Sequence, residues 1–162
     1  MAVTRADVLG ELAYSPKTGL FTRLTCRGNQ KPGSIAGAFV TGGVRIRVCG
    51  QPFLAHRLAW LCVHGEWPEG DLDHINGNSR DNRIANLRPC DDSQNQANRK
   101  LSSLNTSGFK GVCWNAKSGK WQAGIKVRGK SYHLGLFTDP AEAHAAYLKA
   151  AHEFFGEFAR AA

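Results

Sequence analysis

The sequence has no long apolar run, and no segment approaches the roughly 20 apolar residues that a helix needs to cross a bilayer. Residues 1–7 also lack the apolar stretch of a signal peptide. These absences argue against an integral membrane protein with helical spans. We therefore expect a soluble intracellular protein that has no membrane partner.

Closely spaced cysteines are also missing. Five cysteines are present, an odd number, and no two of them form a Cys-x-x-Cys spacing. Zinc ribbons depend on such pairs, and disulfide frameworks use cysteines in even numbers. We therefore interpret all five as small, buried hydrophobic side chains. They are Cys26, Cys49, Cys62, Cys90 and Cys113.

Acidic residues are scarce overall but not in the middle of the chain. In 162 residues, 21 Lys and Arg outweigh 13 Asp and Glu, so the net charge is +8. Residues 1–50 carry seven basic and two acidic side chains, residues 101–162 eight and four, and residues 51–100 six and seven. The basic excess predicts attraction to nucleic acid, although a merely soluble basic protein stays open. Carboxylates between basic flanks favour a metal-dependent site that acts on a phosphodiester.

The composition is that of a folded protein, with 42% hydrophobic and 21% charged residues. Residues 44–48 alternate apolar and basic side chains, which is the period of a half-buried strand. Arg45 and Arg47 then share one face, which is open either to a backbone phosphate or to solvent. Apolar residues recur at helical spacing over 56–63, and Gly65 ends that helix.

The last third predicts a second module after a Ser- and Asn-rich linker at 102–108. Strand patterns cover 111–114, 121–127 and 131–137, with Trp121, Ala123, Ile125 and Val127 on one face. Asp139 and Pro140 then begin a helix that runs to about residue 155. We expect a three-stranded antiparallel sheet covered by this helix, with a basic opposite face.

Residues 73–99 concentrate the side chains that phosphodiester hydrolysis needs. A neutral imidazole such as that of His74 can take a proton from water, and a divalent cation can stabilise the phosphate and the leaving oxygen. Asn76 and Gly77 predict a turn, and Leu87 begins a second strand after it. A helix that starts at 91 or 92 brings Asn95 toward Asp73, and such oxygen ligands suit Mg²⁺. A purely structural Asp-His pair is the alternative.

The order and spacing of these motifs resemble the HNH endonucleases of phages and mobile introns. The resemblance covers about residues 10–100. It rests on His-Arg-Leu-Ala-Trp at 56–60, Gly-Glu-Trp-Pro at 65–68, Asp-His-Ile-Asn-Gly-Asn at 73–78, Asp-Asn-Arg at 81–83, Asn-Leu-Arg at 86–88 and Gln-Asn at 94–95. It implies a ββα-metal nuclease module with a core at about 70–100.

By that resemblance, His74 matches the general base, and Asp73 and Asn95 match the metal ligands. Asn86 matches the middle Asn, which bonds to the backbone and holds the loop that carries the base. An Asn in the last position favours Mg²⁺ or Mn²⁺ over tightly held zinc. Arg57 either reaches a DNA phosphate or has a structural role at the start of its helix.

Residues 105–160 resemble the AP2/ERF DNA-binding domain. The motifs are Ser-Gly-Phe-Lys-Gly-Val at 107–112, Gly-Lys-Trp-Gln-Ala at 119–123, Leu-Gly-Leu-Phe at 134–137 and Glu-Ala with Ala-Ala-Tyr at 142–147. The resemblance implies that the sheet lies in a DNA groove. The residues that would face DNA are Lys110, Trp114, Asn115, Lys117, Lys126 and His133. Cys113, Asn115 and His133 depart from the plant factors, so their target sequence does not transfer.

Together these observations predict an α+β protein with an HNH domain at 1–101, a linker at 102–108 and an AP2/ERF-like domain at 109–162. We expect a metal-dependent endonuclease, of homing type, that nicks or cuts double-stranded DNA as a monomer or weak dimer. A gene carried by a phage or mobile element would place it in a bacterial cytoplasm. An inactive DNA-binding regulator is the alternative, and an RNA-directed protein with base-stacking aromatics is a third hypothesis.

Overall fold

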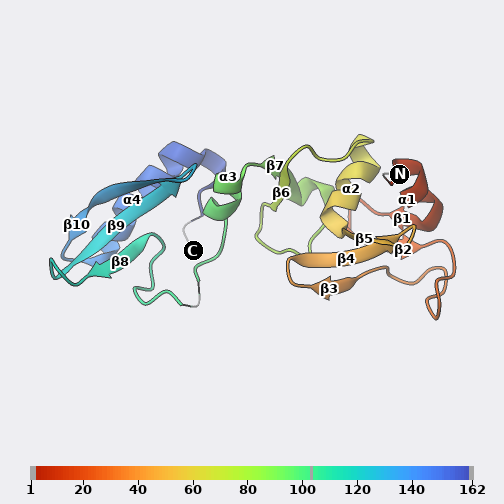
Figure 1. Cartoon of the computed structure of the whole chain (residues 1–162), viewed down its shortest axis with the longest axis horizontal. Helices are drawn as coiled ribbons and strands as arrows, with labels where there is room; N and C mark the ends of the chain where they lie inside the picture. Colours follow the sequence, from red (N-terminus) through yellow and green to blue (C-terminus); the bar gives the residue numbers. More distant parts are fainter. Residues whose placement is uncertain (1–2, 103, 161–162) are drawn as a thin grey trace. The chain divides into compact units, whose positions relative to one another are not determined.

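The computed structural model describes residues 3–102 and 104–160 and has the mixed α+β character that the sequence predicted (Figure 1). Contacts divide the chain into two compact units, Met1–Pro89 and Cys90–Ala162. Among the described residues, none of the helices combines the length and apolar character that a bilayer crossing demands.

The first unit combines short helices with three small sheets. Strands β1 and β2 form one pair, β3, β4 and β5 form an antiparallel sheet, and β6 pairs with β7. The elements are α1 (Arg5–Glu11), β1 (Leu12–Tyr14), β2 (Phe21–Arg23), β3 (Ala38–Val40), β4 (Gly43–Val48), β5 (Gln51–Leu54), α2 (Ala55–His64), β6 (Asp71–His74), the 3-10 helix η1 (Ile84–Asn86) and β7 (Leu87–Cys90).

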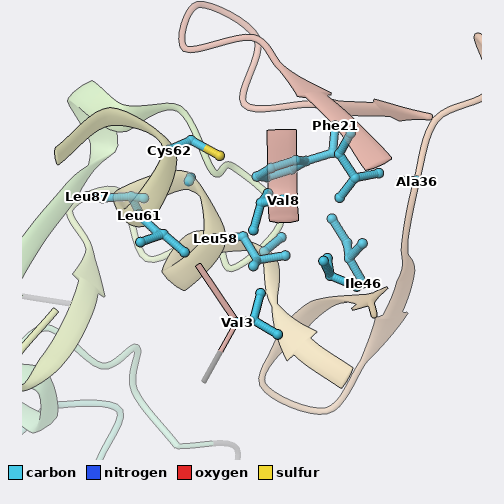
Figure 2. Close-up of a cluster of buried hydrophobic side chains, with 13 residues drawn as sticks. Val3, Val8, Phe21, Ala36, Ile46, Leu58, Leu61, Cys62 and Leu87 are labelled. Carbon is cyan, nitrogen blue, oxygen red and sulfur yellow. The ribbon is translucent and has the colours of Figure 1, made fainter. Parts of the chain in front are cut away.

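The core of this unit lies between α2 and the strands, as Figure 2 shows. Leu58 and Leu61 of α2 belong to the same buried cluster as Phe21 of β2 and Ile46 of β4, and all four are at most 2% exposed. Gly65 caps α2 in the left-handed conformation, so the predicted helix end is confirmed. Leu87 of β7 belongs to the same core, which ties the β6–β7 pair to the body of the unit.

The second unit is a three-stranded antiparallel sheet, in the order β10–β9–β8, with α4 packed on it. Its sheet and helix confirm the prediction for the last third of the chain. Asp139 caps α4 by accepting a hydrogen bond from the Ala141 amide at 2.8 Å, and Pro140 is its first residue. The elements are α3 (Asp92–Ala97), β8 (Val112–Asn115), β9 (Lys120–Val127), β10 (Lys130–Phe137), α4 (Pro140–Phe155) and the 3-10 helix η2 (Gly156–Phe158).

The short helix α3 packs with the second unit. Its Ala97 is buried in one cluster with Tyr147 and Phe155 of α4. At its other end, the Ser93 Oγ accepts a hydrogen bond from the Arg128 amide at 2.6 Å. The compact units therefore divide at 89/90, whereas the predicted linker at 102–108 falls inside the second unit. The reason is that the apolar partners of α3 belong to α4, which follows that linker in the sequence.

The cysteines differ from the prediction that all are buried. Cys62 is buried in the first core and Cys90 is partly buried, but Cys26, Cys49 and Cys113 are exposed. Cys113 faces away from α4 because strand residues alternate between the two faces of a sheet and its neighbour Val112 takes the buried face. The spacing of cysteines carries no information about such alternation.

Gly19 packs directly on the backbone of the loop between β6 and β7. Its φ is +72°, and a Cβ placed there would lie 2.4 Å from the Arg83 nitrogen and 2.6 Å from the Asn82 carbonyl carbon. Gly50 is the matched control, because its φ is +80° but nothing lies within 4 Å of its Cβ position.

Replacing Gly19 with Ala should lower the free energy of unfolding by about 3–5 kcal/mol, because the left-handed backbone strain adds to a collision with immobile backbone atoms. Gly50→Ala should cost only about 1–2 kcal/mol. Urea denaturation of both variants measures the difference. Equal losses in the two variants would show that Gly19 does not support the loop sterically.

Candidate active site

The site is built on β6, which ends with Asp73 and His74. Both residues are buried, with 5% and 8% of their surfaces exposed. Adjacent strand residues point to opposite faces, so the carboxylate and the imidazole meet different neighbours. Leu72 is buried beside them and anchors the strand.

Asp73 forms a buried ion pair with Arg88 of β7. The Arg88 Nε and Nη2 atoms donate to the same Asp73 Oδ2 atom, at 3.0 and 2.9 Å. The two side chains are only 6% and 11% exposed. Such a pair contributes little net stability, because desolvation of both charges offsets their attraction. Its consequence is that the carboxylate is held in place inside the protein.

His74 is oriented by Asn82. The Asn82 Oδ1 lies 3.2 Å from the His74 Nε2, while the Asn82 Nδ2 donates to the Arg80 carbonyl at 3.4 Å. Because the amide nitrogen of Asn82 is turned toward Arg80, its oxygen faces the imidazole and accepts the proton of Nε2. The neutral ring then carries its lone pair on Nδ1. That nitrogen is therefore the one suited to take a proton.

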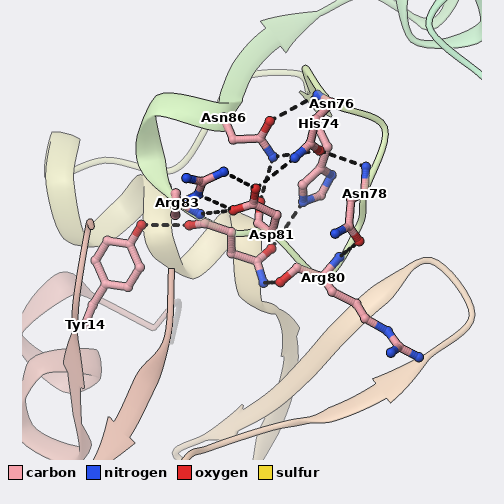
Figure 3. A network of polar contacts seen from close by, with 9 residues as sticks. Tyr14, His74, Asn76, Asn78, Arg80, Asp81, Arg83 and Asn86 are labelled. Atoms are coloured by element: carbon pink, nitrogen blue, oxygen red, sulfur yellow. Dashed lines mark hydrogen bonds and ion pairs between the residues drawn. The ribbon is translucent and has the colours of Figure 1, made fainter. Parts of the chain in front are cut away.

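Asn86 braces the loop that follows His74, as Figure 3 shows. Its Oδ1 accepts from the Asn76 amide at 3.0 Å, and its Nδ2 donates to the Asn76 Oδ1 and to the Asp81 carbonyl at 3.1 and 2.8 Å. Its own carbonyl accepts from the Ile75 amide at 2.9 Å. One buried side chain thus ties both arms of the loop together.

Further contacts join the loop to the rest of the first unit. The Tyr14 hydroxyl donates to the Asn82 carbonyl at 2.7 Å (Figure 3), and burial raises the pKa of Tyr14 to about 12. The Arg80 guanidinium lies 4.0 Å above the Phe39 ring of β3. Hydrogen bonds from Arg83, at 2.6 and 2.8 Å, lower the pKa of Asp81 to about 2.

His56, at the start of α2, packs against the ring of His74. Its ring is nearly perpendicular to that of His74, with 5.0 Å between the centroids. It is 8% exposed, and its Nδ1 has no hydrogen-bond partner within the described part of the chain. Burial lowers the pKa of His56 to about 4, and the neighbouring His74 and Arg57 add to this effect. At neutral pH, His56 therefore places no positive charge beside His74.

Arg57 has the structural role that the sequence left open. Its Nη1 donates to the Gly70 carbonyl at 3.0 Å, and its Nη2 donates to the Pro68 carbonyl at 3.2 Å. The guanidinium holds the loop between α2 and β6, so it sets where β6 begins. This use of its donors accounts for Arg57 without a DNA phosphate.

Four of the residues predicted to face DNA are placed compatibly with that expectation. Strand register puts Asn115, Lys126 and His133 on the sheet face opposite α4, where Lys126 pairs with Ser131 and His133 pairs with Gly124. Lys117 is exposed in the turn between β8 and β9. A hollow of about 370 Å³ on this sheet is lined by Lys126 and His133.

Two predicted DNA contacts are placed elsewhere. Trp114 pairs with Trp121 across the strands and so lies on the α4 side of the sheet, its ring 5.0 Å from that of Trp121. The Lys110 ammonium donates to the carbonyls of Ala97, Arg99 and Arg160, and burial lowers the pKa of Lys110 to about 8. Lys110 therefore closes the C-terminal end of α3 rather than facing DNA, because three carbonyl acceptors satisfy its ammonium group.

The donor set fits a cation with oxygen ligands. Among residues 3–102 and 104–160, no three or more His, Cys, Asp and Glu side chains gather as a metal site. The Asp73 carboxylate is an oxygen ligand of the kind that suits a cation such as Mg²⁺, which retains several waters. Asn95 is a partly buried residue of α3 in the second unit, and its convergence with Asp73 stays a prediction.

Comparison with known proteins bears directly on this site. Residues 53–97 match the model of the HNH endonuclease family. The chain is also 32% identical to Protein 3.8 of Escherichia phage T7 over 106 residues, which are 65% of this chain and 87% of that relative. The chain belongs to the HNH endonuclease family. The family assignment supports a DNA nuclease. No solved structure matches it.

The HNH segment contains Asp73, His74, Asn86 and Asn95, whereas β8–β10 lie outside it. Sequence reasoning assigned no role to Arg88 or Asn82, although both stand in the quoted motifs. Their partners depend on the pairing of β6 with β7 and on the path of the loop. Knowledge of how β6 and β7 are aligned would have placed Arg88 near Asp73. The sequence alone does not give that alignment.

The buried His56 predicts how stability changes with pH. The unfolded chain binds a proton on His56 near pH 6.5, whereas the folded protein binds it only near pH 4. The free energy of unfolding should therefore fall as the pH drops from 6.5 to 4, by up to roughly 3 kcal/mol, and be insensitive to His56 above that window.

Urea denaturation from about pH 4 to about pH 7.5 measures this contribution, because that range spans the folded pKa of His56 and the ordinary pKa of His. His56→Gln should flatten the dependence, and His64→Gln, at an exposed position of the same helix, should leave it unchanged. The same slope in wild type and His56→Gln would contradict the assignment.

Proposed function

We propose that this HNH endonuclease hydrolyses DNA phosphodiesters with His74 as the general base and with a divalent cation, Mg²⁺ in preference to Mn²⁺, held by Asp73 and Asn95. The observation that carries the proposal is the orientation of His74 by Asn82 beside a buried Asp73 that is paired with Arg88. Asn86 is the positioning residue, since it braces the loop that follows His74.

The residues of the chain divide the chemistry between them. His74 takes a proton from water at Nδ1, because Asn82 accepts the proton of Nε2. The bound cation would supply charge stabilisation for the phosphate and the leaving oxygen. Arg88 holds the Asp73 carboxylate in place for that cation, and a guanidinium is a donor that suits a phosphate oxygen. His56 stays neutral, so it does not oppose protonation of His74.

We further propose that the second unit is an AP2/ERF-like module that binds double-stranded DNA through the face of β8–β10 opposite α4. The exposed Lys117 and Lys126, with Asn115 and His133, support this assignment. A nuclease site and a separate DNA-binding sheet in one chain favour a homing-type enzyme that acts at a recognised site. One site per chain favours nicking by a monomer or weak dimer, in the cytoplasm of a bacterial host.

A second candidate is a DNA-binding regulator without catalytic activity. One observation favours it, namely that Arg88 already neutralises Asp73. The active enzyme is favoured because the base, its orienting amide and the braced loop are all in place. Cleavage assays separate the two candidates, because the regulator would bind DNA with unchanged affinity and cut it under neither Mg²⁺ nor Mn²⁺.

His74→Ala should reduce the rate of plasmid nicking by about 100-fold or more, because removal of a general base costs that much. DNA affinity without metal should be unchanged. His64→Ala is the control, since His64 is exposed at the end of α2. Supercoiled plasmid with Mg²⁺, with Mn²⁺ and with a chelator provides the assay. Full activity of His74→Ala would rule out its role as the base.

Lys126→Gln should weaken binding to duplex DNA and reduce the slope of log affinity against log salt by about one, which is the signature of one lost phosphate contact. Lys149→Gln, at an exposed position of α4, should change neither quantity. Fluorescence anisotropy of a labelled duplex over a salt series measures both. An equal effect of the two substitutions would place DNA elsewhere than on the open sheet face.

A further inference from the structure

The first unit contains an arginine-lined hollow that the proposed catalysis does not use. It has a volume of about 450 Å³ and lies over β2, β3 and β4. Four guanidinium side chains line it. Two come from β4, one from the last residue of β2 and one from the segment that follows β2. These are Arg23, Arg27, Arg45 and Arg47.

Arg23 has no counter-charge of its own in the described part of the chain. The residue is 6% exposed, and its Nε has no hydrogen-bond partner in the described part of the chain. No ion pair of Arg23 is found among those residues either. A buried guanidinium nitrogen without an acceptor costs free energy, so an isolated chain gains nothing from holding it there. An anionic ligand with oxygen acceptors would supply the missing partner.

The other three arginines are positioned by the fold rather than neutralised by it. Arg45 and Arg47 share the exposed face of β4, while Ile46 and Val48 between and beside them fill the core. The Arg27 Nη1 donates to the Arg47 carbonyl at 2.9 Å. The only carboxylate paired with this group is that of Glu11, 3.6 Å from the Arg27 Nη1, within the part of the chain that the structure describes.

We propose that this hollow binds a phosphate group of the DNA backbone. Guanidinium forks match phosphate oxygens in geometry and charge. No aromatic ring lies among the described residues that line the hollow, so a nucleobase would find nothing to stack on, which favours a backbone phosphate over a free nucleotide. This inference rests on the proposed action on DNA, and it adds a contact outside the HNH segment.

The test measures DNA affinity without metal, by anisotropy of a labelled duplex over a salt series. The double variant Arg45→Gln/Arg47→Gln should lose about tenfold or more in affinity, with a salt slope smaller by one to two. Arg5→Gln is the matched control, because Arg5 is exposed in the same unit but does not line the hollow. Affinities equal to that of Arg5→Gln would overturn the proposal.

Arg23→Met separates a ligand-binding role from a structural one. Because the guanidinium nitrogen lacks a partner in the protein, the variant should keep a Tm at least as high as wild type and yet bind DNA more weakly. A lower Tm with unchanged DNA affinity would show that Arg23 serves only the fold, and would overturn the proposal.

A third arm identifies the source of the phosphate. Inorganic phosphate or ATP at millimolar concentration should displace the duplex no more than sodium chloride of equal ionic strength. A different outcome would assign the hollow to a free nucleotide instead. In that case ATP would raise the Tm of wild type but not of the arginine variants, and those variants would bind DNA as tightly as wild type. Nicking by His74→Ala would refute the catalytic proposal alone, since the binding arms contain no metal and no cleavage readout.

Discussion

The hydrogen bonds of the buried Asn86 side chain are the constraint on which the active-site loop depends. The segment between β6 and β7 has little regular backbone pairing, so its polar groups need partners from side chains. Asn86 meets the Asn76 amide and the Asp81 carbonyl at once, and its carbonyl takes the Ile75 amide. Because both arms of the loop are tied to one residue, Asn82 stays beside the imidazole of His74.

Buried polar and charged side chains are the recurring feature of the first unit. Asp73 and Arg88 are desolvated together, and a buried pair of this kind is weak support for stability. The buried side-chain nitrogens without partners among the described residues are those of His56 and Arg23. One lies beside His74 and the other in the arginine-lined hollow. Polar groups that cost stability in the isolated chain are expected where a ligand is to be met.

Local patterns predicted the regular elements well. Alternation of apolar and basic residues identified β4, and capping residues identified the ends of α2 and α4, because these signals act within a few residues. Assignments that depend on partners were less successful. Trp114 was expected on the open face, but its pairing with Trp121 decides its side. The grouping of α3 with the nuclease module agrees with the HNH match at residues 53–97, but the sequence did not reveal that Ala97 packs with Tyr147.

Residue types and their order by themselves determined the class of chemistry: an acid, an imidazole and amides at the spacing of an HNH nuclease, within a basic chain. Only the tertiary structure decided which atoms meet. Arg88 faces Asp73, His56 faces His74, and Arg23 joins Arg45 and Arg47 around one hollow. The reason is physical: spacing along the chain sets which side of a strand a residue occupies, whereas contacts across strands follow from how the core packs, to which the whole chain contributes.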